Sequence, residues 1–335
     1  MTRKMYLEFS MFIICVTCLV LIPVAGFAGE ITFKLGHVAP PNTTHDISAK
    51  KFAERVRANT GGEINVKVFG SSQFGTLPEH WGQIKGGAID IFVQDVGAVF
   101  MPEPPPKNFM ITLFPYLFES QKHFHNFLYS DLFKSMMAKV EKAANVKYLG
   151  YIGDRSPRGF STTDRRVTTP EEIKGLKLRV PPAPPFVAAY KSWGAAPTPV
   201  HAKDVFVSVK SGMVVGIDND LLAMYQAKYY EIQNFYIAVD YMRSGLGCWI
   251  NAKRWESLSE DTKAALLKSA QETEAYVNAF TAKQFIDAKK ALTKAGMEII
   301  SPDLKPWMEP TEKEVRKNEG KLWEKGLYDK IKALK

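Results

Sequence analysis

Apolar and polar residues alternate at two places near the start of the chain, with a different period between them. Residues 31–37 and 64–68 alternate as half-buried strands do, whereas apolar residues within 49–56 recur at helical spacing. A helix over 79–85 and an apolar strand over 88–93 follow. Strand, helix and strand in this order predict parallel pairing, so we expect one α/β unit here.

The same alternation resumes in the middle of the chain. Residues 169–172 (Thr-Pro-Glu-Glu) combine a capping hydroxyl, an early proline and a glutamate, which is a pattern of helix starts. A strand over 176–180, helices over 186–193 and 203–210, and a short strand over 214–217 are predicted after it. These elements predict a second α/β unit.

A long mixed pattern begins at Ser259 and predicts a single helix that continues to Lys294. At about 1.5 Å per residue this helix exceeds about 50 Å, which is longer than one unit is wide, so we expect it to bridge both. Residues 309–335 have a basic amphipathic helix pattern. The apolar stripe expected on the long helix consists of Ala264, Leu267, Ala270 and Ala275.

The first 28 residues have the pattern of an export signal. Arg3 and Lys4 precede an apolar run over 11–24, and small residues follow up to Ala28. The run is shorter than the roughly 20 apolar residues of a membrane span, so we prefer a signal peptide to an amino-terminal anchor. Cleavage is predicted after Ala28, and the mature protein is expected in the periplasm.

Length and charge narrow the class further. The chain has 335 residues, 46% of them hydrophobic, and a net charge of +9. A single core stops growing near roughly 250–300 residues, so two lobes are expected. We assign residues 29–155 plus 245–284 to lobe I, and residues 156–244 plus 285–335 to lobe II. The charge fits nucleic acid or acidic solutes, and export argues against nucleic acid.

The amino-acid sequence gives little support for a catalytic or a metal-binding site. The sequence has neither a Gly-x-Ser-x-Gly elbow nor a Gly-rich phosphate loop. His123 and His125 would point to different faces of a helix, and Cys248 lies in an apolar strand pattern. Asp218 and Asp220 could bind a cation, although a turn built on Asx side chains is preferred. We expect no cofactor.

Arginines are the more informative residues. Arg179 ends a predicted strand, and ligands of α/β proteins bind at the carboxyl ends of parallel strands. A guanidinium there can hold a carboxylate through two parallel hydrogen bonds. Arg155 and Arg158 lie at the start of the second unit. A surface position or a salt bridge between the lobes remains the alternative for each arginine.

At these residues the chain resembles the substrate-binding proteins of tripartite ATP-independent periplasmic (TRAP) transporters, the DctP-type family. The resemblance rests on 169–181 (Thr-Pro-Glu-Glu-Ile-Lys-Gly-Leu-Lys-Leu-Arg-Val-Pro), on 194–200 (Gly-Ala-Ala-Pro-Thr-Pro-Val), on 52–75, and on 210–220 with 228–233. It implies two α/β lobes that are joined by a hinge and close over a ligand, as in other periplasmic binding proteins of the Venus-flytrap type.

The resemblance also implies site residues. Arg179 corresponds to the arginine that binds the ligand carboxylate, and Asn219 to a ligand-contacting asparagine. Arg158 lies about one position from a second family arginine, with Arg155 as a substitute. Other implied contacts follow the strands of lobe I, namely His37, Gln94 and Asp95. Aromatic candidates for the pocket wall, for which core packing is the alternative, are Phe186, Trp249 and Trp81.

The implied function is capture of a small organic acid and its delivery to the two membrane subunits of a TRAP permease. The carrier is expected to be a monomer that binds no nucleic acid, and its cleft is expected to be basic. The open alternatives are a ligand-sensing partner of a membrane receptor, an exported enzyme acting on organic acids, and a carrier that bridges its ligand through a cation at Asp218 and Asp220.

Overall fold

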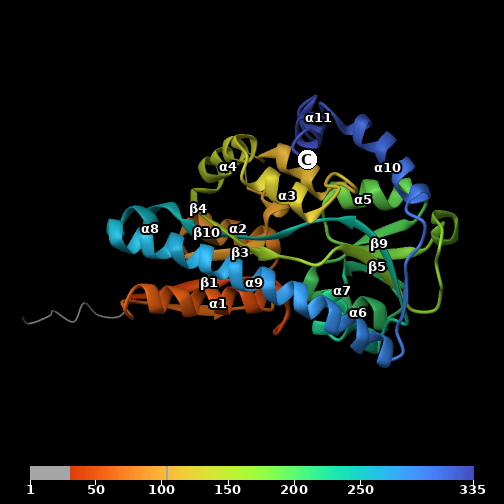
Figure 1. The fold of residues 1–335 in the computed structure, drawn as a ribbon, viewed down its shortest axis with the longest axis horizontal. Helices are drawn as coiled ribbons and strands as arrows, with labels where there is room; N and C mark the ends of the chain where they lie inside the picture. Colours follow the sequence, from red (N-terminus) through yellow and green to blue (C-terminus); the bar gives the residue numbers. More distant parts are fainter. Residues whose placement is uncertain (1–30, 103–104) are drawn as a thin grey trace, which may run out of the picture.

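The computed structural model describes residues 31–102 and 105–335, and the expected signal peptide lies outside them. Two β-sheets form the two halves of the molecule, and Figure 1 shows them side by side with one long helix along both. The predicted α/β fold with a lobe-bridging helix is confirmed. No helix within the described ranges combines the length and apolar character that a membrane crossing requires.

The first sheet has the strand order β2-β1-β3-β10-β4. Strand β10 runs antiparallel to both of its neighbours, and β1 pairs in parallel with β2 and β3 as the alternating pattern predicted. The strands are β1 (Ile31–Gly36), β2 (Ile64–Phe69), β3 (Ile91–Asp95), β4 (Val146–Asp154) and β10 (Gly245–Asn251). The first helices are α1 (Thr44–Asn59), α2 (Leu77–Gly86), α3 (Gln121–Leu128) and α4 (Asp131–Ala144).

The second sheet has the order β11-β9-β5-β8-β6-β7, in which β5 is antiparallel to both neighbours. Its strands are β5 (Arg158–Thr162), β6 (Lys177–Val180), β7 (Ala196–Pro199), β8 (Gly216–Asp220), β9 (Phe235–Met242) and β11 (Glu298–Ile300). The helices of this part are α5 (Pro184–Ser192), α6 (Val205–Lys210) and α7 (Leu221–Gln226), whereas α8 (Ala252–Glu256) packs on β4 and β10 of the first sheet. Single 3₁₀ turns are η1 (Val96–Ala98), η3 (Pro170–Ile173), η4 (Ala202–Asp204) and η5 (Tyr229–Glu231), and a longer one is η2 (Lys107–Leu113).

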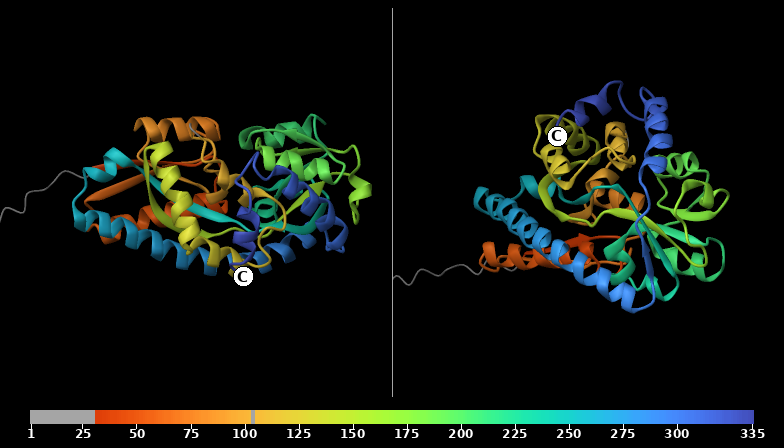
Figure 2. Two further views of the ribbon diagram at one scale, coloured as in Figure 1. Left: turned by 90° about the horizontal axis from the view of Figure 1, so that it is seen from above. Right: turned by 45° about the vertical axis from the view of Figure 1, so that its right-hand side comes forward.

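Two short connections join the sheets. The chain passes from β4 to β5 through residues 155–157, and returns from β9 to β10 through residues 243–244. The third link is α9 (Glu260–Lys294), which contacts β4 and α1 on one side and α7 on the other. The left view of Figure 2 shows α9 extending along the length of the molecule past both sheets.

The buried face of α9 differs from the predicted stripe. Ala270 is buried, whereas Ala264, Leu267 and Ala275 are exposed. Small and hydroxyl-bearing residues occupy the buried positions because the helix lies close to the backbone of β4. The buried residues are Thr262, Leu266, Ser269, Ala270, Thr273, Val277, Thr281, Ala288 and Leu292.

Strand β4 accommodates this close approach with two glycines. Gly150 and Gly153 have φ values of +143° and +133°, which residues with a Cβ rarely adopt. A Cβ on Gly153 would lie 2.2 Å from Cγ1 of Val277 on α9. Register shifts in the pairing of β4 with β10 accompany these positions, and such irregularities bend a strand locally.

The end of the chain contacts both halves. Helix α10 (Lys305–Asn318) packs against α5 of the second half. Beyond it, α11 (Leu327–Lys332) lies near α3, where Nε2 of His123 is 2.8 Å from the Ile331 carbonyl oxygen. Figure 1 shows these two helices passing over the top of the molecule. The basic pattern of the tail therefore forms two short helices.

Candidate ligand-binding site

A cavity of about 160 Å³ lies between the two sheets. The carboxyl ends of β1, β3, β6 and β8 meet there, as expected for ligand sites of α/β proteins. The predicted site residues that line it are Gln94, Asp95, Arg155, Arg158, Arg179, Phe186 and Asn219. These residues are far apart in the sequence, and the crossing of the chain between the sheets brings them together.

Arg179 is 5% exposed at the end of β6. Its Nε and one terminal nitrogen donate to the Val200 carbonyl oxygen at 2.9 and 2.8 Å, and the other donates to the Asp218 carbonyl oxygen at 3.3 Å. Among the described residues, no carboxylate lies within 4 Å of the guanidinium. Since a guanidinium has five N–H donors, two remain for a ligand.

The charge of this arginine is buried away from water. Desolvation, together with the nearby charge of Arg158, lowers the pKa of Arg179 to about 10, against partial compensation from Asp218. The group therefore stays charged at neutral pH, without a carboxylate partner in its surroundings. A ligand carboxylate that accepts its two remaining N–H groups would supply the missing negative charge.

Arg158 is committed to a partner from the protein. Its Nε donates to Oδ1 of Asp218 at 2.6 Å, and one terminal nitrogen bonds the same oxygen. The other carboxylate oxygen accepts the hydroxyl protons of Tyr190, at 2.8 Å, and Tyr241. Burial opposes the charge on Arg158, but Asp218 outweighs it and the pKa rises. Arg158 therefore shapes the cavity wall as half of an ion pair.

Arg155 joins the two halves across the cavity. It lies in the first connection between the sheets and donates to Oδ2 of Asp95, the last residue of β3, at 3.3 Å. Its other terminal nitrogen bonds the Asp220 carboxylate and donates to Oδ1 of Asn219 at 3.1 Å. Burial works against the charge on Asp220, yet Arg155 beside it lowers the pKa. The arginine therefore fixes the relative position of β3 and β8.

The start of α1 supplies site residues that the sequence reading did not select. Nε2 of His45 lies 3.2 Å from Oε1 of Gln94, and burial followed by the charge of Arg155 holds the pKa of His45 well below its usual value. Thr44 donates through its backbone N–H to Oε1 of Gln226 at 2.9 Å, which links α1 to α7. The only sequence signal for these positions is the helix start after the Pro40-Pro41 break.

Three predicted contacts, His37, Trp249 and Trp81, lie away from the cavity lining. His37 is fully buried behind it, with Nε2 at 3.4 Å from Oδ1 of Asp46 and its ring against Gly70. Trp249 is also fully buried, and its ring packs at 5.3 Å from that of Trp81. Both tryptophans therefore serve core packing, which was the alternative for them. Phe186 does line the cavity, below the guanidinium of Arg158 at 5.1 Å.

The other polar candidates have structural partners. Asp218 binds Arg158, and Asp220 accepts from Ser156 at 2.7 Å and from the Ala223 backbone N–H at 3.0 Å. Within the ranges described, no three His, Cys, Asp or Glu side chains are grouped as a metal site. Cys248 is buried, and burial raises its pKa.

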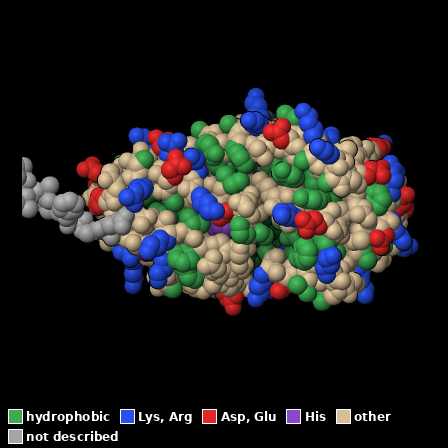
Figure 3. Space-filling model, turned by 90° about the horizontal axis from the view of Figure 1, so that it is seen from below, with side chains coloured by type: hydrophobic (Ala, Val, Ile, Leu, Met, Phe, Trp, Pro, Cys, Tyr) green, Lys and Arg blue, Asp and Glu red, His purple; other side chains and the backbone are tan. Residues whose placement is uncertain are grey.

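The cavity is less basic than its arginines suggest. Arg155, Arg158 and Arg179 lie among Asp95, Asp218 and Asp220, so the three positive charges face three negative ones. Figure 3 shows Lys and Arg side chains spread over both halves of the face in view, interspersed with Asp and Glu. Because only Asp95 and Asp220 of these aspartates line the cavity beside the three arginines, the basic cleft stays a prediction.

Two α/β halves with a cavity and a buried arginine between them define a bilobed solute-binding protein. Residues 35–321 match the family model of bacterial extracellular solute-binding protein, family 7 (DctP). The chain belongs to this family, and the resemblance found in its motifs is confirmed.

Similar proteins agree with this assignment. A solute-binding protein of Roseobacter denitrificans is 28% identical over 289 residues, covering 86% of this chain and 87% of that protein. The 2,3-diketo-L-gulonate-binding periplasmic protein YiaO of Escherichia coli is 27% identical over 270 residues, 81% of each chain. A crystal structure of a TRAP periplasmic solute-binding protein of R. denitrificans, with bound L-galactonate, has a TM-score of 0.81 at 24% identity and covers 91% of this chain and 98% of that chain. It has the same fold.

Proposed function

We propose that this protein captures a small organic acid between its two lobes and holds the carboxylate on Arg179. The observation that carries the proposal is the buried guanidinium, which has no carboxylate partner among the described residues and has two N–H groups to spare. Bidentate pairing with a planar carboxylate suits such a group. The names of relatives that bind diketogulonate and sialic acid, both carboxylates, support the same chemistry.

The lobes follow the two sheets. Residues 29–155 with 245–284 form lobe I, and residues 156–244 with 285–335 form lobe II. The two short connections and α9 form the hinge region. Contacts of Arg155 with Asp95 and Asp220 hold the lobes together, and the ligand adds contacts to both. A ligand favours closure only through its higher affinity for the closed state.

The loaded protein delivers its acid to the membrane subunits of a TRAP permease. It works as a periplasmic carrier rather than as an enzyme, after cleavage of its signal peptide behind Ala28. Membership of the solute-binding family supports this role, as does the similarity to periplasmic binding proteins of Escherichia coli and Vibrio cholerae. Around the cavity, Arg155 and Arg158 form ion pairs with the aspartates, and these groups do not form a nucleophile and base.

The test is ligand binding by an Arg179 variant. A thermal-shift screen of organic acids identifies a ligand, because a ligand at about 100 times its Kd stabilises by about 2.7 kcal/mol. Arg179→Ala is expected to remove binding in calorimetry, and Arg179→Lys to weaken it strongly because a point charge lacks the fork. Arg166→Ala is the matched control, since Arg166 is exposed and paired with Glu298 at 2.8 Å. Unchanged affinity in Arg179→Ala overturns the proposal.

A further inference from the structure

We infer that the cavity selects acids with one carboxylate and an apolar body, and rejects dicarboxylates and polyhydroxylated sugar acids. This inference rests on the proposed function and names its substrate class. Three features of the lining carry it: the supply of free cations, the state of its hydroxyl groups, and an apolar wall beside the arginines.

The lining offers one arginine to a ligand. Arg155 and Arg158 are already bonded to Asp95, Asp218 and Asp220. A second carboxylate on the ligand would lose its hydration on entering the cavity and would find no unpaired cation there. It would also lie near two carboxylates of the lining, those of Asp95 and Asp220. Burying a charge without a partner is costly, so a dicarboxylate loses more on entry than it gains.

The two lining histidines do not change this balance. His45 is buried and its pKa is held low, so it is neutral at physiological pH. His201 is partly exposed to solvent. A ligand carboxylate beside His201 would stay in contact with water. An ion pair there contributes about 0–1 kcal/mol, which is less than about sixfold in affinity.

Four of the five hydroxyl groups of the lining already donate within the protein. Thr43 donates to the Pro40 carbonyl oxygen at 2.7 Å, and Ser72 to that of Val38 at 3.1 Å. Thr44 donates to Gln226 at 3.2 Å, and Thr76 donates to Glu79 at 2.8 Å. A hydroxyl has only one proton to donate, so these four groups can only accept from a ligand. The fifth hydroxyl, that of Tyr229, donates to no other described residue.

A few donors remain available besides the arginines. They are the Tyr229 hydroxyl and the amide groups of Gln94, Asn219 and Gln226, which line the cavity and donate to no other described residue. These donors can serve the carboxylate and a further acceptor, such as an oxo oxygen. A six-carbon sugar acid carries four or more hydroxyls along its body, and each one that lies against the apolar wall without a partner costs about tenfold in affinity or more.

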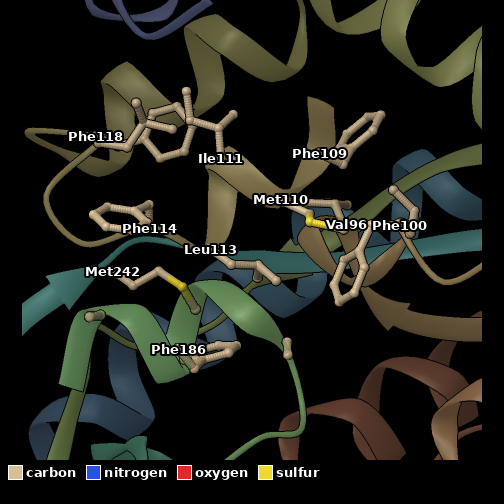
Figure 4. Close-up of a cluster of buried hydrophobic side chains, with 14 of the residues drawn as sticks. Val96, Phe100, Phe109, Met110, Ile111, Leu113, Phe114, Phe118, Phe186 and Met242 are labelled. Carbon is tan, nitrogen blue, oxygen red and sulfur yellow. The ribbon is translucent and has the colours of Figure 1, made fainter. Parts of the chain in front are cut away.

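Apolar side chains form the rest of the wall. Phe100, Leu113, Phe186 and Met242 all line the cavity and are all buried in the hydrophobic core. Figure 4 shows Leu113, Met242 and Phe186 converging from three segments, with Phe100 on the other side of Leu113. Because Phe186 also lies below Arg158, the apolar wall begins next to the charged group. If the carboxylate of an acid binds Arg179, the rest of the acid therefore packs against these apolar side chains.

The experiment compares three acids with six carbons by calorimetry: hexanoate, adipate and D-gluconate. Hexanoate is expected to bind at least about 50-fold more tightly than either of the others. In the series from propanoate to hexanoate, each added methylene is expected to tighten binding about fourfold until the cavity is filled. Adipate or D-gluconate binding as tightly as hexanoate, with the affinity lost in Arg179→Ala, overturns the inference and leaves the proposed function standing. If none of these acids binds and the wider screen finds none, the proposed function fails.

A variant of the wall gives a second test. Met242→Gln keeps the length of the side chain and adds an amide, so it is expected to weaken hexanoate about tenfold and propanoate less than twofold. Met308→Gln is the control, because Met308 is 44% exposed and lies outside the lining. Equal losses for both acids contradict the apolar wall. The series on the native chain decides the question if Met242→Gln does not fold.

Discussion

Nε of Arg158 donates to Oδ1 of Asp218 at 2.6 Å, and the carbonyl oxygen of the same aspartate accepts from Arg179 at 3.3 Å. One residue in the middle of β8 therefore neutralises the first arginine and orients the second. The arrangement leaves Arg179 as the arginine whose charge can be met by a ligand. It also gives Asp218 a structural role in a strand, where the sequence favoured a turn built on Asx side chains and left a cation ligand as the alternative.

The first prediction concerns this pair. Asp218→Asn leaves Arg158 charged and buried without a counter-ion, so it is expected to lower the free energy of unfolding by about 3–5 kcal/mol. Urea denaturation followed by circular dichroism measures the change. Asp164→Asn, at an exposed position, is the control and should stay within about 0.5 kcal/mol of the unaltered protein. Equal midpoints for both variants would show that the pair does not stabilise the fold.

The second prediction concerns the link between the lobes. Arg155→Met removes the bonds to Asp95 and Asp220, so the unliganded protein is expected to populate a more open form. Small-angle scattering should show a larger radius of gyration, and calorimetry about a tenfold weaker affinity for the acid. Arg166→Met serves as the surface control. An unchanged radius together with unchanged affinity contradicts a bridging role.

The third prediction is a pH dependence. Nε2 of His125 is 2.7 Å from Oδ1 of Asp154 at the end of β4, and this hydrogen bond raises the pKa of His125 in the folded protein. Its contribution to stability is therefore fully present below the unfolded pKa of about 6.5 and is lost as the pH rises through the folded pKa. His125→Gln is expected to flatten the decline of the urea midpoint above about pH 6.5. The same decline in both proteins would assign it to other groups.

The fourth prediction tests the close packing of α9 on β4. Gly153→Ala places a Cβ against Val277 and strains a backbone with φ of +133°, so it should destabilise by at least about 2 kcal/mol. Gly212→Ala is the control for backbone strain alone, because φ is +71° there and nothing lies within 4 Å of the added Cβ. The packing argument fails if Gly153→Ala costs no more than Gly212→Ala.

The spacing of apolar residues was sufficient to predict the strands that have one buried face and most of the helices between them. It did not find β5, whose five residues are all buried and show no alternation, or β9, a nearly continuous apolar run that could equally be helical. Strand β7 contains two prolines and lies at the edge of its sheet, where the pattern is weakest. The capping pattern at 169–172 does mark the start of a helical element, but this element is the short 3₁₀ turn η3 and not an α-helix.

The site was predictable where it follows a strand end, as at Arg179 and Asn219. His37 also follows a strand, yet its ring points to Asp46 behind the cavity, because which side a residue after a strand faces depends on the loop that follows. His45 lies in the first turn of α1, so it lines the cavity only because the whole helix is placed with its start there. Which arginine remains unpaired depends on contacts between residues about 40 to 65 positions apart, which no local pattern contains.

The central claim is that the ligand carboxylate pairs with Arg179. A crystal structure of the protein with hexanoate, or with the best acid of the screen, tests it most directly. We expect both carboxylate oxygens within about 2.7–2.9 Å of the terminal nitrogens of Arg179, while Arg158 keeps Asp218 as its partner. A bound acid whose carboxylate pairs with Arg155 or Arg158, with Arg179 still bonded only to backbone carbonyls, would contradict the account.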